Sequence, residues 1–147
     1  MRLDVFADPV EFLEAATEWL MLKEAENNLI LGLAARAAAE APVDPWFALV
    51  RDGDSGIACA WQTIPSTVGI TRVGDERGIP LLAGVIAPRL SGGERLVGPE
   101  PEIGHLAQQV AGLLGLYTDL ANPTSNSIYR KIGYRGICDT GVYRLGA

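Results

Sequence analysis

Apolar residues recur at helical spacing in two segments near the N-terminus. The first helix is predicted to start at Asp8 and Pro9, because aspartate caps helix N-termini and proline suits the first helical position. Its inward face holds Phe12, Ala15, Ala16 and Trp19. A second helix is predicted over residues 22–40, where the apolar positions at helical spacing are Leu22, Ala25, Leu29, Leu33 and Ala37.

Short strand-like runs follow these helices. Residues 46–53 end at an Asp-Gly turn signal and residues 56–64 begin just after it, which predicts a β-hairpin. A third strand is predicted over 67–73. Residues 74–95 contain two prolines, five glycines and no sustained period, which predicts a short, broken helix and then a loop.

The remaining pattern alternates strands and helices. It predicts strands at 96–98, 114–120, 134–139 and 141–146, and helices at 99–114 and 125–132. Antiparallel strands followed by strand–helix crossovers predict an α/β (α+β) fold, in which helices cover both faces of a mixed sheet. A length of 147 residues suits a single domain over 1–147.

Charge narrows the choice of partner. The net charge of −6 argues against nonspecific nucleic-acid binding. Residues 1–115 carry 8 basic and 16 acidic side chains, whereas residues 116–147 carry 4 basic and 2 acidic ones. An anionic ligand would therefore prefer the C-terminal part.

Cysteine and histidine usage points to no metal site. Cys59 and Cys138 lie in strand-like runs and are interpreted as buried thiols, with a disulfide as the alternative. His105 has no Asp, Cys or His at ligand spacing, so no metal site is expected. Early acidic residues argue against a signal peptide, and no apolar run reaches the ~18 residues of a membrane span. A cytoplasmic location without membrane contact is the expectation.

The C-terminal residues carry a specific resemblance. The run LYTDLANPTSNSIYRKIGYRGICDTGVYRLG resembles the closing segment of GNAT-superfamily N-acetyltransferases, with the matching positions Asn122, Asn126, Tyr129, Gly133 and Tyr134. The resemblance implies a GNAT-like fold with a mixed, mostly antiparallel central sheet.

A second resemblance covers the N-terminal part. Residues 23–37 and the strands after them resemble the first lobe of a bacterial GNAT subgroup with two tandem lobes, in which that lobe is degenerate. The chain then joins this first lobe to the tail of the second, with a seam near 115–116.

The GNAT resemblance also implies a chemistry. Acetyl-CoA would donate an acetyl group to a primary amine of a small molecule or peptide, and a homodimer is left open. Tyr129 would act as the general acid. Asn122, Asn126 and Tyr129 would contact the cofactor, although both asparagines also suit turns and caps. Apart from the resemblance, Glu100 and Glu102 are both candidates for the base that acts on the amine, and nothing in the sequence singles out either one.

The phosphate-binding loop of that family, Q/R-x-x-G-x-G/A, is not found where it is expected. Counted from the sequence, the fourth strand is followed by residues 98–107, which bring Glu100 and Glu102 to the start of a helix. Near matches occur at 89–94 and 109–114 and are interpreted as loop and helix. Two functions therefore stay open: an N-acetyltransferase, or a catalytically inactive GNAT-like domain that binds a ligand, dimerises or is the remnant of a longer enzyme.

Overall fold

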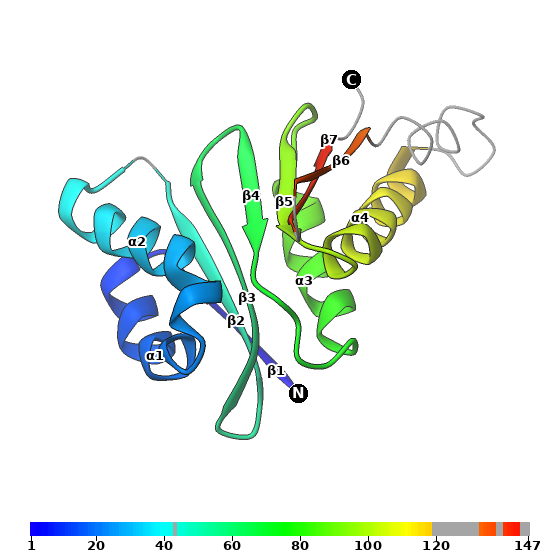
Figure 1. Cartoon of the computed structure of the whole chain (residues 1–147). Helices are drawn as coiled ribbons and strands as arrows, with labels where there is room; N and C mark the ends of the chain where they lie inside the picture. Colours follow the sequence, from blue (N-terminus) through cyan, green and yellow to red (C-terminus); the bar gives the residue numbers. More distant parts are fainter. Residues whose placement is uncertain (43, 119–132, 138–139, 145–147) are drawn as a thin grey trace.

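The computed structural model describes residues 1–42, 44–118, 133–137 and 140–144. Figure 1 shows the arrangement of its helices and strands. In chain order they are β1 (Arg2–Phe6), α1 (Pro9–Met21), α2 (Glu24–Glu40), β2 (Trp46–Asp52), β3 (Ser55–Ile64), β4 (Thr67–Ile70), α3 (Gly78–Ile86), a 3₁₀ turn (Ala87–Arg89), β5 (Arg95–Pro99), α4 (Glu102–Thr118), β6 (Gly133–Ile137) and β7 (Thr140–Arg144).

The strands form one sheet in the order β1-β2-β3-β4-β5-β7-β6. Neighbouring strands are antiparallel except β4 and β5, which are parallel. Helices α1 and α2 cover one face of the sheet, and α3 and α4 cover the other (Figure 1). This confirms the predicted α/β class with a mixed, mostly antiparallel sheet. None of the helices in the described ranges is long and apolar enough to cross a membrane.

Each face of the sheet has its own hydrophobic core. Under α1 and α2, the rings of Phe12 and Phe47 stack with their centroids 4.6 Å apart, and Trp61 packs beside them. Under α3 and α4, the core is mostly aliphatic and includes Leu82, Leu106 and the ring of Trp46. Phe12 and Trp19, expected on the inward face of the first helix, are buried and half-buried, and Trp46, Phe47 and Trp61 are buried as well.

Local turn and capping chemistry appears where the sequence predicts it. The Asp8 carboxylate accepts a hydrogen bond of 2.8 Å from the Val10 N–H, and Pro9 occupies the first turn of α1. Gly53 has a φ of 61° in the hairpin turn between β2 and β3, a conformation that glycine adopts without strain. The broken helix predicted within 74–95 is α3 with its short 3₁₀ extension.

The N-terminal strand β1 was not predicted. Its five residues pair antiparallel with β2, from Arg2 opposite Arg51 to Phe6 opposite Phe47. So short a segment has no periodicity that distinguishes it from a loop, and pairing with β2 makes it a strand. Every later strand is therefore one place further along than the sequence count assumed.

The strand predicted at 114–120 is also wrong. Helix α4 continues to Thr118, because Leu113 and Leu114 extend the apolar stripe that begins at Ile103 and no proline interrupts it. Residues 119 and 120 lie outside the described residues, as does the helix predicted at 125–132. The seam predicted near 115–116 falls inside α4, and both the seam and the single-domain assignment stay predictions.

Strands β4 and β5 run side by side for three residue pairs and then separate. The pairs run from Thr67 opposite Arg95 to Gly69 opposite Val97. Beyond Ile70 the chain stays bonded to β3, where the Thr71 N–H donates to the Cys59 carbonyl and the Gly74 N–H to the Ile57 carbonyl, both at 2.9 Å. Strand β5 instead turns away toward α4, so the sheet opens between the two strands.

Gly98 allows β5 to lie close to β4 just before this opening. A Cβ at this position would stand 2.5 Å from Ile70 Cγ1 and 3.1 Å from the Ile70 carbonyl oxygen. A side chain here would therefore push the two strands apart.

We predict that Gly98→Ala lowers the free energy of unfolding by about 1–3 kcal/mol, the usual cost of overpacking. Gly84→Ala is the matched control, because a Cβ there meets nothing within 4 Å. In the middle of α3 that change should stabilise by about 0.5–1 kcal/mol. Urea unfolding of both variants measures the difference, and equal effects would contradict the predicted crowding at Gly98.

Candidate functional site

A pocket of about 440 Å³ lies where β4 and β5 separate. Its volume falls within the ~300–1,000 Å³ typical of small-molecule sites. Its walls come from α2, β3, the end of β4 and β5. The lining residues are Ala25, Glu26, Asn28, Leu29, Ile30, Trp61, Ile70, Thr71, Arg72, Val97, Gly98 and Pro99.

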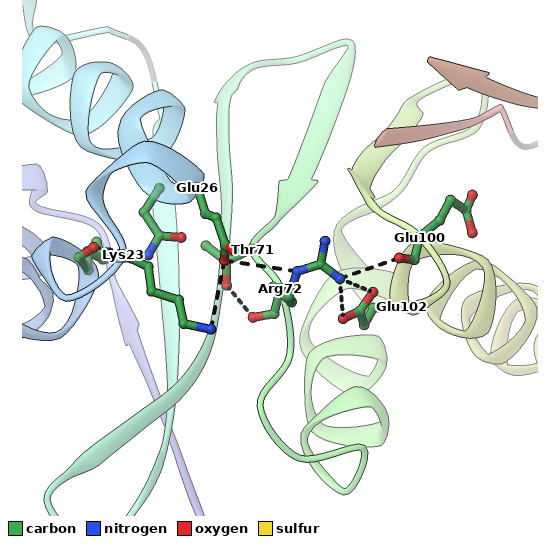
Figure 2. Close-up of polar contacts among 8 residues, drawn as sticks. Lys23, Glu26, Thr71, Arg72, Glu100 and Glu102 are labelled. Carbon is green, nitrogen blue, oxygen red and sulfur yellow. Dashed lines mark hydrogen bonds and ion pairs between the residues drawn. The ribbon is translucent and has the colours of Figure 1, made fainter. Parts of the chain in front are cut away.

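Arg72 spans the opening between the strands. Its Nη1 lies 3.2 Å from Glu102 Oε1 and 3.5 Å from the Glu100 carbonyl oxygen, both on the β5–α4 side. Its Nε lies 4.0 Å from Glu26 Oε2 on α2. Figure 2 shows the Arg72 guanidinium between helices α2 and α4. Arg72 thus joins three parts of the chain that are far apart in the sequence.

A second hollow of about 210 Å³ lies on the other side of the Glu26–Arg72 pair and shares both residues with the pocket. Its other walls include Trp19, Leu22 and Ile57. The two hollows therefore form a groove along the start of α2, with the ion pair at its centre. We call this the α2 groove, made of the pocket, the hollow and the Glu26–Arg72 pair between them.

The two acids proposed as bases face different ways. The Glu102 side chain is only 12% exposed and pairs with Arg72. The Glu100 carboxylate instead accepts a hydrogen bond of 3.1 Å from the Tyr143 hydroxyl. Both carboxylates are therefore engaged with side chains of this chain, and neither is held ready for a proton from an amine.

The sequence count assigned the phosphate loop to the wrong strand–helix connection. Because β1 was missed, residues 96–98 were counted as the fourth strand, whereas they belong to the fifth. The segment between the fourth strand and its helix is residues 71–77, which lead into α3. They do not match Q/R-x-x-G-x-G/A, since Asp75 stands three residues after Arg72, and Pro80 three after Arg77.

The start of α3 does not fit a diphosphate. Backbone N–H groups at a helix start bind anions only when they have no other partner. Here the Arg77 N–H donates to the Asp75 carboxylate at 2.9 Å, and the Gly78 and Ile79 N–H groups donate to backbone carbonyls. Pro80 has no N–H. The donors of this first turn are thus already used.

The side chains at this helix start add negative charge. Arg77 Nη2 lies 2.6 Å from Asp75 Oδ2, and hydrogen bonds from Arg77 hold the pKa of Asp75 below its ordinary value. Asp75 is therefore ionised at neutral pH, with Glu76 beside it. An incoming diphosphate would have to displace the Asp75 carboxylate from Arg77.

In the near match at 89–94, the hydrogen-bond donors of the loop are already bound by the Glu94 carboxylate. The Glu94 carboxylate accepts hydrogen bonds from the Ser91 N–H, the Ser91 hydroxyl and the Gly92 N–H, at 2.7–2.8 Å. These are the backbone donors that would otherwise face an external anion. The other near match, at 109–114, lies inside α4. Both therefore have the loop and helix roles expected of them.

The residues predicted to contact the cofactor, Asn122, Asn126 and Tyr129, lie outside the described residues. Their roles stay predictions. Cys59 is buried, and burial raises the pKa of its thiol, so it is the inert core cysteine that was expected. Cys138 lies outside the described residues.

His105 Nδ1 lies 3.9 Å from Glu76 Oε1. No group of three metal-ligating side chains occurs within the residues that the structure describes.

Comparisons with known proteins add little. No protein-family model matches the chain, and no curated protein matches it. Among solved structures, the chain is similar to the crystal structure of PaiA N-acetyltransferase from Thermoplasma acidophilum in complex with coenzyme A. The identity is 12%, the TM-score is 0.42, and the match covers 97% of this chain and 98% of that chain. A likeness this distant carries no argument about function, and the tandem-lobe subgroup stays a prediction.

Sequence reasoning missed Glu26 and Arg72 as site residues. Glu26 lies in a helix rich in charged residues, and Arg72 lies at the end of a strand-like run. Neither belongs to a motif. Only the three-dimensional pairing of β3, β4 and β5 brings them together, so no local signal could have singled them out.

The Glu94 contacts generate a stability prediction. Burial alone would raise the pKa of Glu94, but the hydrogen bonds from Ser91 and Gly92 outweigh it and lower the pKa. Glu94 is only 6% exposed. We predict that Glu94→Gln destabilises the protein by about 1–3 kcal/mol at pH 7, the range for lost charge-assisted hydrogen bonds.

The pH dependence follows from the lowered pKa. Stability from ionised Glu94 is fully present above the unfolded-state pKa of about 4.3 and is lost as pH falls through the lower folded-state pKa. The gap between wild type and Glu94→Gln should therefore shrink below about pH 4. Glu14→Gln on the exposed face of α1 is the control. A gap that persists unchanged at low pH would refute the role of the charge.

Proposed function

We propose that this chain is a GNAT-like N-acetyltransferase that transfers an acetyl group from acetyl-CoA to a primary amine. The observation that carries the proposal is the separation of the parallel strands β4 and β5, which opens a pocket of about 440 Å³ between them. Backbone groups of a strand that has lost its neighbour are available to a substrate, including an N–H for a developing oxyanion. The C-terminal resemblance through Asn122, Asn126 and Tyr129 supports the same chemistry.

The α2 groove supplies the amine side of this proposal. Glu26 is half exposed at the boundary of the pocket and offers a carboxylate to an ammonium group. Asn28 and Thr71 also line the pocket, although the Thr71 hydroxyl already accepts from the Cys59 N–H at 2.8 Å and donates to the Arg72 carbonyl. The polar group best placed to receive an amine is therefore Glu26.

A second candidate is a GNAT-like domain that binds a ligand without acetyl transfer. The start of α3 favours it specifically. Its N–H donors are used within the chain, and Asp75 and Glu76 oppose a diphosphate. Under this alternative the α2 groove still binds a ligand, but acetyl-CoA does not.

Thermal denaturation with and without acetyl-CoA tests the two candidates. Saturation at 100 times Kd stabilises a protein by about 2.7 kcal/mol. Under the enzyme proposal, millimolar acetyl-CoA raises Tm, and acetyl transfer to amines is detectable by thiol release. Tyr129→Phe should keep the Tm shift and lower kcat by about 10²–10⁴-fold, as expected for loss of a proton donor. No shift at millimolar acetyl-CoA would reject the enzyme proposal.

Asp75→Asn tests whether the carboxylate at the start of α3 opposes the binding of acetyl-CoA. It removes the carboxylate from the α3 start and releases Arg77, so acetyl-CoA should bind about tenfold or more tightly, in line with a charge–charge term of ~1–4 kcal/mol at close range. Isothermal titration calorimetry of both proteins measures the change. Asp54→Asn, an exposed residue in the β2–β3 turn, changes the net charge equally and should leave the affinity unaltered. Equal effects of the two substitutions would show that only net charge matters.

A further inference from the structure

We propose that the α2 groove recognises an α-amino acid with an apolar side chain. Glu26 would bind the ammonium group, Arg72 the carboxylate, and the pocket the side chain. The idea that this amino acid is the acetyl acceptor rests on the proposed function. The binding itself does not, because it involves no acetyl-CoA.

The first argument is the spacing of the two charges. Arg72 Nε and Glu26 Oε2 lie 4.0 Å apart, beyond a good hydrogen bond, and their side chains are 40% and 50% exposed. Partly exposed pairs of this kind are weak and are readily exchanged for a ligand. An α-amino acid carries its ammonium and carboxylate on one carbon atom. It therefore presents opposite charges at a spacing that matches this pair.

The second argument is the orientation of Arg72. Its Nη1 donates to Glu102 and the Glu100 carbonyl, which orients the guanidinium with its Nη1 toward the β5–α4 side. Its Nε side points toward α2 and, within the part of the chain that the structure describes, contacts only Glu26, at 4.0 Å (Figure 2). A guanidinium fork binds a carboxylate through two parallel hydrogen bonds, and an arginine that is already oriented loses little entropy in doing so.

The third argument is the wall beside the charges. Next to Glu26 and Arg72, the pocket is mostly apolar, with Leu29, Trp61 and Val97 among its lining residues. Leu29 is 56% exposed, so part of this apolar wall is open to a ligand. A side chain such as that of leucine would bury this apolar surface while its charged end meets the ion pair.

The test uses the full chain without acetyl-CoA and compares three ligands of similar size. They are L-leucine, 3-methylbutylamine, which lacks the carboxylate, and 4-methylpentanoate, which lacks the amine. Calorimetry or ligand-observed NMR should show L-leucine binding at least tenfold more tightly than either analogue. Equal binding of all three, or no binding of L-leucine, would overturn the proposal.

Two substitutions assign the roles. Glu26→Gln should weaken L-leucine binding at least tenfold, whereas 4-methylpentanoate should bind equally well or more tightly, because a neighbouring negative charge is removed. Arg72→Lys keeps the positive charge but loses the fork, and should weaken L-leucine while leaving 3-methylbutylamine unchanged. The control is the ion pair of Arg36 and Glu40 at the far end of α2, whose substitution by glutamine should change nothing.

The outcomes separate this proposal from the proposed function. If Arg72→Lys does not fold, the three ligands and Glu26→Gln still decide, because Glu26 is half exposed and its loss should be tolerated. Binding of L-leucine without acetyl transfer would keep the amino-acid site and reject the enzyme. Acetyl transfer to amines with no preference for L-leucine would support the enzyme and reject the amino-acid site.

Discussion

The hydrogen bonds between β3 and the chain just after β4 determine the architecture of the candidate site. Thr71 and Gly74 stay bonded to β3, whereas the pairing with β5 ends after three residue pairs, so the chain follows β3 where the two strands separate. The opening that results is wide enough for a pocket and narrow enough for one arginine to span. Gly98 keeps the strands close up to the point of separation, so the opening begins abruptly at Ile70.

Two carboxylates of the chain bind backbone donors of the kind that hold phosphates in other proteins. Asp75 accepts the first N–H at the start of α3, and Glu94 accepts two N–H groups of the 91–94 loop. Each satisfies donors that would otherwise be exposed or unpaired, which stabilises the local backbone. An external diphosphate would have to displace these carboxylates before it could use the same donors. Two of the acidic residues of the N-terminal part therefore lie at the start of α3 and in the 91–94 loop, the two places where backbone donors could bind a phosphate.

The sequence predicted what local chemistry determines. The cap at Asp8 and the turn at Gly53 depend on a few neighbouring residues, and both are found. It missed β1 and the end of α4, because a five-residue edge strand needs β2, and a leucine run suits either a strand or a helix. Without β1 in the count, the phosphate loop was predicted after β5, whereas the corresponding connection follows β4. The Glu26–Arg72 pair of the α2 groove could not be predicted, since these two residues meet only through the folded sheet.

Charge balance in the α2 groove limits which ligands it can hold. Lys23, Glu26, Arg72 and Glu102 form an alternating series in which each acid lies within 4.0 Å of a base. Glu100 stands apart from it, because its carboxylate faces Tyr143. A ligand with net charge would leave one member of the series without a partner in a partly desolvated groove, which is costly. A ligand that carries one charge of each sign fits between Glu26 and Arg72 and keeps the alternation of charges, so this ion pair favours a zwitterion at that point of the series.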